Sequence, residues 1–226
     1  MARNRAGRRK GKVGARESRK LATRERIRAA ASELFARRGY GAATMREIAT
    51  RAHVGLGTLF NYAEDKRDLV FLIFNEELNA TTDVALAAPR PRDAPVEQLM
   101  AVFRVHYRWL ATQPALARIL LQELTFYSSG KQAATFHAIR KRLMDGIEGL
   151  IRRGQEEKKI AARENPAVIA RHIFFVYSAS LRWWIAAPRP DPGKGIADLR
   201  RLLNLQFEGL RPQALTGPGS ARRSCA

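Results

Sequence analysis

The sequence TMREIATRAHVGLGTLFNYAEDK, residues 44–66, decides the fold. Thr44 and Glu47 have the spacing of a capping box, which predicts that a short helix begins directly after Thr44. The glycines of VGLG then mark a turn, and a second short helix is expected at about residues 57–63. Two helices joined by a glycine-bearing turn, the second of them short, are typical of a helix-turn-helix.

The second helix carries many hydrogen-bonding and aromatic groups and only one clear apolar anchor, Leu59. In a helix-turn-helix this helix enters the major groove of DNA, which is about 12 Å wide. We therefore expect Leu59 to hold the helix on the core while its other side chains face DNA. An ordinary helical hairpin with a solvated polar face is the alternative interpretation of the same pattern.

Several side chains around this turn have the chemistry to contact DNA. Asn61 and Arg46 can read the edges of adenine and guanine, respectively. The hydroxyl of Thr58, at the expected start of the second helix, is suited to a phosphate. Gly57 leaves room for the sugar-phosphate backbone, and the ring of Phe60 is suited to a thymine methyl. Tyr62 and Lys66 are suited to bind phosphates.

The charge of the chain points to a polyanionic partner. Its 226 residues carry a formal net charge of +20, of which +12 lies in residues 1–67 and +8 in residues 1–20 alone. Such an imbalance is typical of proteins that bind nucleic acid. We expect residues 1–20 to form a disordered basic arm that follows DNA phosphates or enters a minor groove. A purely solubilising tail is the alternative.

Other features narrow the class of protein. The single cysteine, Cys225, cannot form a disulfide within the chain. The N-terminus lacks the apolar segment of a signal peptide, and the longest uncharged apolar stretch, residues 172–181, is too short to span a bilayer. We find no metal-ligand spacing, phosphate-binding glycine motif or activated nucleophile. We therefore expect a cytoplasmic, nucleoid-associated protein without cofactor, membrane contact or catalytic activity.

The rest of the chain continues with helical periodicity and predicts an all-α fold. Thr23 is expected to cap the first helix, Gly39 to end it, and Asp65 to cap the fourth helix. A three-helix front unit then precedes a larger helical bundle. The expected divisions are a disordered basic arm at 1–20, a helix-turn-helix domain at 21–67, an effector-binding and dimerisation domain at 68–211 and a disordered tail at 212–226.

Residues 23–74 closely resemble the DNA-binding domain of the TetR family of transcriptional regulators. The resemblance is carried by AASELFARRGYGAATMREIATRA and by VGLGTLFNYAEDKRDLV. It implies a homodimer that binds a palindromic operator, most simply as a repressor, and that a small-molecule effector releases. By position, the family's DNA-contacting sites fall on Thr44, Arg46, Leu56, Gly57, Thr58, Phe60, Asn61, Tyr62 and Lys66.

Three residues depart from the family pattern. His53 stands where the turn usually has glycine, so this turn is expected to be strained or locally adjusted. Phe60 stands where tyrosine is common, which removes a hydroxyl that could bind phosphate. Ala63 replaces a core aromatic residue, so the second helix is held by less packing.

The larger domain offers candidates for a dimer interface and for an effector pocket. Exposed aromatic and aliphatic side chains anchor interfaces, and the dimer candidates are Trp183, Trp184, Leu202, Leu203 and Phe207. Their alternative place is the core of one chain. The pocket is expected to take a largely apolar ligand and to include Phe103, His106, Tyr107, Leu110, Leu120, Glu123, Phe126, Tyr127, Phe136, His137, Phe174, Tyr177 and Ser178.

Two alternatives remain open from the sequence. Glu123 is either a buried carboxylate that meets a cationic or hydroxylated ligand, or a structural partner of Arg118 or Arg140. The protein as a whole is either the ligand-responsive regulator described above or a sequence-tolerant, DNA-compacting protein. In the second case its basic arm supplies most of the affinity for DNA, and it has no effector.

Overall fold

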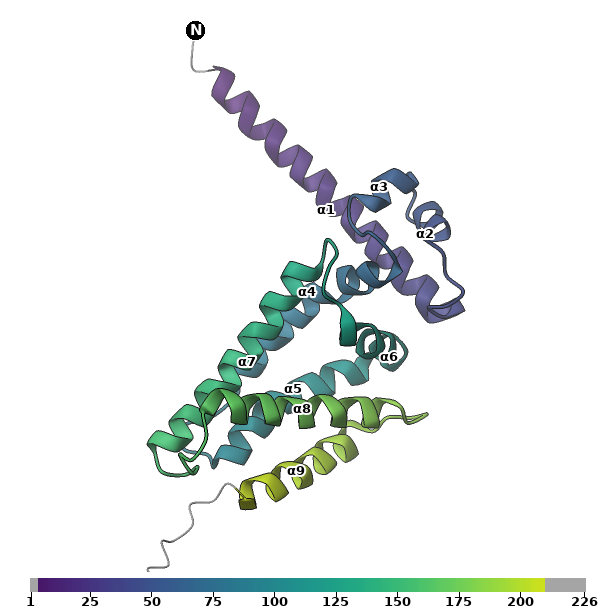
Figure 1. Ribbon diagram of the computed structural model, residues 1–226. Helices are drawn as coiled ribbons and strands as arrows, with labels where there is room; N and C mark the ends of the chain where they lie inside the picture. Colours follow the sequence, from purple (N-terminus) through teal and green to yellow (C-terminus); the bar gives the residue numbers. More distant parts are fainter. Residues whose placement is uncertain (1–3, 210–226) are drawn as a thin grey trace, which may run out of the picture.

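The protein is a bundle of helices (Figure 1). The computed structural model describes residues 4–209, and side chains for residues 16–208. No strand occurs among these residues, so the all-α prediction is confirmed, and no helix among them is long and apolar enough to cross a membrane. In chain order the elements are α1 (Asn4–Arg38), α2 (Met45–Arg51), α3 (Leu56–Phe60), α4 (Lys66–Ala87), α5 (Pro95–Thr112), α6 (Pro114–Glu123), the 3-10 helix η1 (Leu124–Phe126), α7 (Ala133–Glu156), α8 (Pro166–Ile185) and α9 (Pro192–Gly209).

Helix α4 belongs to both parts of the molecule. It packs against α1 in the small N-terminal unit and against α5, α6 and α7 in the larger bundle (Figure 1). Its stretch from Asp68 to Asn75 is buried on every side, as a helix without a polar face must be. The Asp65 side chain caps its start by accepting a hydrogen bond from the Asp68 amide at 2.7 Å, as predicted. The expected domain boundary at residues 67 and 68 therefore falls inside a single rigid helix.

Helix α1 is longer than the sequence predicted. It begins at Asn4 and passes through Thr23, which therefore is not a cap. Residues 4–20 are helical, whereas the sequence predicted a disordered arm there. Residues 1–3 and the predicted tail at 212–226 lie outside the described residues. Arginine, lysine and alanine are good helix formers, and lengthening an existing helix needs no new nucleus. The helix ends at Arg38, and Gly39 directly after it has a φ of 84° in the left-handed region, as expected.

Helix α2 has a hydrogen-bonded cap at each of its ends. At the start of α2 the Glu47 amide donates to Thr44 Oγ1 at 3.2 Å, and the Thr44 amide donates to Glu47 Oε2 at 3.0 Å, which confirms the capping box. At the end of α2 the amide of Val54 donates to the Ala49 carbonyl at 3.0 Å. His53, directly before Val54, has a φ of 51°, which is the left-handed conformation that favours glycine at the end of a helix. The histidine that replaces the usual glycine of this turn therefore has a strained backbone.

Helix α3 is shorter than predicted and begins earlier. It runs from Leu56 to Phe60 with Gly55 as its N-cap, whereas the sequence predicted a helix at about residues 57–63. Thr58 is consequently in the middle of the helix, and Asn61 and Tyr62 belong to the turn that follows. Leu59 is fully buried and holds the helix on the core, as expected.

The larger bundle closes around aromatic side chains of α5. The rings of Phe103 and Tyr177 stack with centroids 4.2 Å apart, and the hydroxyls of Tyr107 and Ser180 are hydrogen bonded at 2.8 Å. The first turn of α9 lies against the same aromatic layer. A Cβ atom on Gly195 would stand 2.6 Å from Trp184 and Tyr107, so only glycine allows α9 to pack this closely.

We predict that His53→Gly stabilises the protein. A side chain in the left-handed region costs on the order of 1 kcal/mol, which glycine avoids, and His53 is exposed, so little packing is lost. The free energy of unfolding in urea should therefore rise by about 0.5–1 kcal/mol. His53→Ala is the matched control, because alanine keeps the Cβ atom and the strain. A loss of stability in the glycine variant would contradict this account of the turn.

Candidate DNA-binding face and effector cavity

The exposed side of α2 and α3 holds most of the candidate DNA contacts. Both helices lie at the outer end of the N-terminal unit, beside α1 and far from α8 and α9 (Figure 1). Leu56, Tyr62 and Lys66 are half-buried, and the other six predicted residues are exposed to solvent: Thr44, Arg46, Gly57, Thr58, Phe60 and Asn61. The structure therefore leaves six of the nine candidates exposed at the surface of the N-terminal unit.

Three of the candidates already hold the N-terminal unit together. The Thr44 hydroxyl is part of the capping box. The Tyr62 hydroxyl donates to the Lys20 carbonyl of α1 at 3.2 Å. The Lys66 ammonium donates to the carbonyls of Tyr40 and Gly41 at 2.8 and 3.0 Å and lies 5.0 Å from the centre of the Tyr40 ring. Two of its three N–H donors therefore bind the backbone of the loop between α1 and α2.

Ion pairs join α2 to α1 at the surface. The Arg51 guanidinium donates to both oxygens of Glu33, with its Nε atom 3.0 Å from Oε2, and Arg38 pairs with Glu47. The Arg51 and Arg37 guanidiniums hold the pKa of the Glu33 carboxyl below its usual value. Because these pairs are exposed, each contributes little to stability. They add surface contacts between α2 and α1 to the packing of the buried Ile48 and Ala49.

A cavity of about 330 Å³ lies within the larger bundle. Helices α4, α5, α6, α7 and α8, together with η1, contribute to its wall, which is mostly apolar. Seven of the thirteen residues predicted for the pocket line it: His106, Leu110, Leu120, Phe136, Phe174, Tyr177 and Ser178. The sequence did not single out the remaining lining residues, which are Leu78, Thr82, Leu121, Leu124, Thr125, Ile139, Arg140, Leu143, Phe175, Leu181 and Arg182.

The other six predicted pocket residues have different places. Phe103 and Tyr107 lie in the aromatic layer under α9, and Phe126 is 80% exposed. The Tyr127 hydroxyl donates to Asp68 of α4. His137 packs against Phe136 but does not itself line the cavity. Glu123 pairs with Arg67, whose Nε atom lies 2.9 Å from Oε2, so the proposed pairing of Glu123 with Arg118 or Arg140 was wrong.

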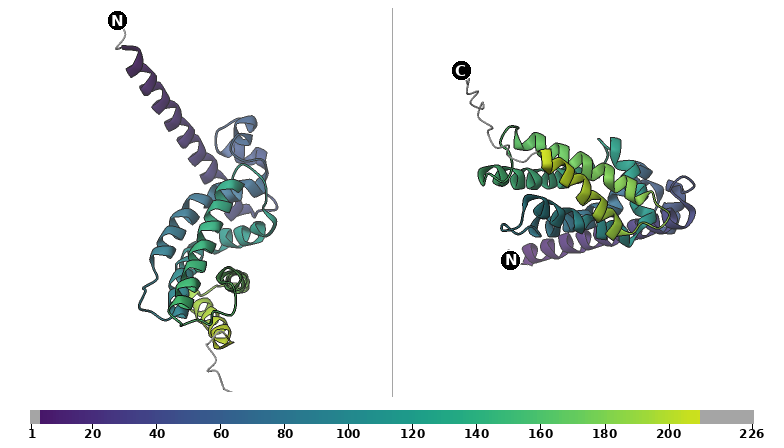
Figure 2. Two further views of the ribbon diagram at one scale, coloured as in Figure 1. Left: turned by 60° about the vertical axis from the view of Figure 1, so that its left-hand side comes forward. Right: turned by 90° about the horizontal axis from the view of Figure 1, so that it is seen from below.

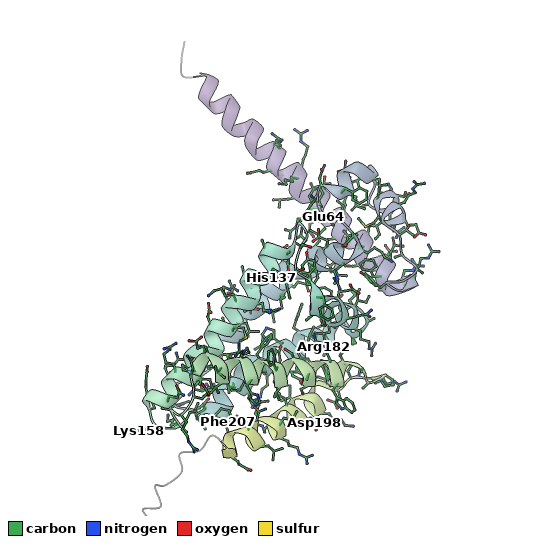
Figure 3. All side chains as sticks on the ribbon, viewed as in Figure 1. Glu64, His137, Lys158, Arg182, Asp198 and Phe207 are labelled. Carbon is green, nitrogen blue, oxygen red and sulfur yellow. The ribbon has the colours of Figure 1, made fainter. Side chains whose placement is uncertain are left out.

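Two arginines stand on the wall of the cavity. Arg182 is half-buried (Figure 3) and donates to the Ser178 carbonyl and to the Thr125 hydroxyl, each at 3.1 Å. Burial lowers the pKa of its guanidinium from the ordinary value. Arg140 is exposed on α7. The cavity wall therefore combines apolar side chains with two arginines, one exposed and one half-buried.

The carboxylate of Asp68 joins the two parts of the molecule. It is 1% exposed and accepts hydrogen bonds from the backbone amides of Glu64, Lys131 and Gln132, each at 2.9 Å. The Tyr127 hydroxyl donates to the same carboxylate, and burial, followed by this hydrogen bond and then by the Asp68 charge, raises the pKa of that phenol. We call this group of residues, Asp68 with its partners Glu64, Tyr127, Lys131 and Gln132, the Asp68 junction.

The Asp68 junction also reaches the candidate DNA-binding face. The Gln132 side-chain amide donates to the Tyr62 carbonyl at 3.0 Å, in the turn directly after α3. Gly130 allows the loop to come this close, because a Cβ atom there would stand 2.8 Å from Asp68 Oδ1. Glu64 lies where the N-terminal unit meets the bundle (Figure 3). No local sequence pattern indicated this junction.

Helices α8 and α9 carry exposed apolar side chains, which we call the exposed stripe. The two helices pack side by side on the bundle (Figure 2). Trp183 is 84% exposed, and the other members of the stripe are Val168, Phe175, Leu202 and Leu205.

Two of the predicted interface residues are instead buried within one chain, and a third is partly covered. Trp184 contacts Tyr107, and its Nε1 atom donates to the Asp191 carbonyl at 2.8 Å. Leu203 is fully buried, and Phe207, near the end of α9 (Figure 3), packs against the core. The prediction was therefore wrong for Trp184 and Leu203, which face inward one position away from the exposed Trp183 and Leu202.

Comparison with known proteins agrees with this architecture. Residues 27–73 match the family described as bacterial regulatory proteins, tetR family. Residues 92–190 match the Tetracyclin repressor-like, C-terminal domain. The fatty acid metabolism regulator protein of Bacillus subtilis (strain 168) is 23% identical over 156 residues, which are 69% of this chain and 80% of that protein.

Solved structures give the same fold. FadR of Thermus thermophilus, a TetR family transcriptional repressor in complex with lauroyl-CoA, is 28% identical with a TM-score of 0.63, over 87% of this chain and 99% of that one. FadR of Bacillus subtilis in complex with stearoyl-CoA is 21% identical with a TM-score of 0.65, over 83% of this chain and 99% of that one. The two family matches fall on the helix-turn-helix unit and on the bundle that holds the cavity, and the chain belongs to the TetR family of bacterial transcriptional regulators.

Proposed function

We propose that the protein is a dimeric repressor that binds a two-fold symmetric operator and leaves it when a long-chain acyl thioester occupies the cavity. The observation that carries this proposal is the cavity itself, with its apolar interior and two arginines on its wall. Its volume of about 330 Å³ is at the lower end of the range for small-molecule sites.

The chemistry of the wall supports an effector with an apolar body and an anionic end. Leucine, isoleucine and phenylalanine side chains suit an alkyl chain. Arg182 and Arg140 suit phosphate groups, which guanidinium binds in a planar, bidentate manner. The Thermus thermophilus relative is described in complex with lauroyl-CoA, and the curated relative from Bacillus subtilis is a fatty acid metabolism regulator. Both relatives support a fatty acyl-CoA as the effector of this chain.

The proposed release of DNA begins at η1. Leu124 and Thr125 line the cavity, and Tyr127, which directly follows η1 in the chain, belongs to the Asp68 junction. A ligand that displaces η1 would therefore pull on the first turn of α4. Helix α4 also lines the cavity with Leu78 and Thr82, so the ligand acts on the same rigid helix at two points. For release, the ligand must bind the DNA-incompetent arrangement more tightly than the other.

A two-fold operator requires a two-fold protein. We propose that the exposed stripe on α8 and α9 forms this dimer, with Trp183 at its centre, because buried aromatic residues anchor interfaces. Movement of α4 would then change the distance between the two copies of α3, whereas the repeat of the DNA groove is fixed. Thr58, Phe60, Asn61 and Arg46 are the residues that we propose read the operator.

We predict that Trp183→Glu makes the protein monomeric. The substitution would bury a carboxylate in an apolar interface, which is costly, whereas in the isolated chain this position is exposed and should tolerate it. Sedimentation at micromolar concentration should show a dimer for the natural protein and a monomer for the variant. Val84→Glu is the control, since Val84 is also exposed but lies on α4 rather than on α8 or α9. A dimer in both variants would place the interface elsewhere.

The proposed function is tested by selecting bound duplexes from a random pool with the purified full-length protein near physiological salt. We expect a two-fold symmetric consensus, and we expect saturating lauroyl-CoA to weaken binding to it by about tenfold or more, a coupling of at least about 1.4 kcal/mol. Coenzyme A without an acyl chain is the ligand control. Arg182→Gln should require more lauroyl-CoA for the same effect.

Two results would contradict the proposal, and they have different meanings. No enrichment over the starting pool would favour the sequence-tolerant, DNA-compacting alternative. A symmetric consensus whose affinity is the same with and without lauroyl-CoA would keep the regulator but reject the acyl thioester as its effector.

A further inference from the structure

His106 places an unpaired polar ring against the apolar interior of the cavity. It lies on α5, lines the cavity and is 2% exposed. Both of its ring nitrogens are buried without a hydrogen-bond partner. Its ring lies beside that of Tyr177, with ring centroids 6.0 Å apart. Tyr107, the next residue on the same helix, differs in this respect because its buried hydroxyl is paired with Ser180.

The imidazole of His106 is neutral at physiological pH. Burial lowers its pKa to about 4, and the Val102 carbonyl one turn earlier opposes that shift without forming a hydrogen bond of ordinary geometry to either nitrogen. A neutral imidazole has one N–H donor and one bare nitrogen that accepts. Leaving either group unpaired in an apolar site is unfavourable, and leucine or phenylalanine would fill this position without that cost. The ring therefore suits a partner that arrives with the ligand.

The polar groups of the cavity are unevenly placed. Arg140 and Thr125 are exposed and Arg182 is half-buried, whereas Leu110 and Leu120, which line the cavity with His106, are buried. Thr82 is also buried on this wall, but its hydroxyl already donates to the Leu78 carbonyl at 2.7 Å. An anionic end held by the arginines would leave the alkyl part of the ligand beside His106. An unsubstituted alkyl chain cannot pair with the ring.

We propose that His106 recognises a hydroxyl group on the buried part of the effector, so that the preferred ligand is a hydroxylated acyl chain rather than an unsubstituted one. This inference rests on the proposed function, in which the cavity takes an acyl chain. A hydroxyl satisfies either face of the imidazole, because it accepts from the N–H group and donates to the bare nitrogen. The pairing makes His106 the residue that determines specificity within one class of ligand.

The test compares lauroyl-CoA with the positional isomers of hydroxylauroyl-CoA by calorimetric titration of the full-length protein. At least one isomer should bind about tenfold or more tightly than lauroyl-CoA, as expected when a buried polar group gains its missing partner. In His106→Leu this preference should disappear, and lauroyl-CoA should bind at least as tightly as before. His106→Gln, which keeps a donor and an acceptor, should retain part of the preference.

A conservative change elsewhere in the cavity is the matched control. Leu120→Met should alter the affinity for lauroyl-CoA and for its hydroxylated isomers alike, so that the preference between them remains. The comparison of ligands on the natural protein needs no variant, so it holds even where a substitution impairs folding. If lauroyl-CoA binds and every isomer binds no more tightly, the role of His106 is refuted while the proposed function stands. If none of these ligands binds, the proposed function itself fails.

Discussion

The structure depends on the buried carboxylate of Asp68, in the first turn of α4. A buried carboxylate is costly unless its oxygens are fully hydrogen bonded, and here four donors satisfy it. Those donors come from the turn after α3, from the residue after η1 and from the loop before α7. Because the charge needs all of them, these segments are held at one spacing, and the N-terminal unit cannot move freely on the bundle.

In our proposal, this arrangement lets a cavity far from α3 affect DNA binding without a long chain of side-chain contacts. Helix α4 is buried on all sides between Asp68 and Asn75, and packed helices slide between discrete positions rather than deform. One end of α4 lies at the Asp68 junction, and Leu78 and Thr82 further along it line the cavity. In our proposal, a ligand changes which position of α4 is preferred. The candidate DNA-contacting residues follow as a unit, since Tyr62 and Lys66 are bonded to neighbouring backbone.

Much of the fold could be predicted from the sequence because its signals are local. The capping box at Thr44, the left-handed glycine at position 39 and the cap at Asp65 each involve residues a few positions apart. The exposed side of α2 and α3 was predictable for the same reason, since a short helix with one anchor at Leu59 has little else to bury. The predicted helix start at Thr58 was wrong because Gly55 can serve as an N-cap two positions before the second glycine of the turn.

The parts that the sequence did not indicate depend on contacts between distant residues. Tyr127 and Gln132 bond to Asp68 across about sixty positions of the sequence. The periodicity of apolar residues does not indicate such a pairing. Trp183 and Trp184 are chemically identical in the sequence, and only the packing of α8 on α5 and α9 decides that Trp184 is buried. The sequence did not indicate that Arg182 lines the cavity, because charged side chains ordinarily lie at the surface. The helical state of residues 4–20 follows from continuation of α1, which composition alone does not reveal.

The most direct test of this coupling is hydrogen exchange at the backbone amides of Glu64, Lys131 and Gln132, measured on the operator-bound protein before and after addition of lauroyl-CoA. These amides donate to Asp68, so they are protected while the junction is intact. We expect their exchange to become faster as the ligand binds and the operator is released. Release of the operator with unchanged exchange at all three amides would contradict the account, because the signal would then reach α3 by another route.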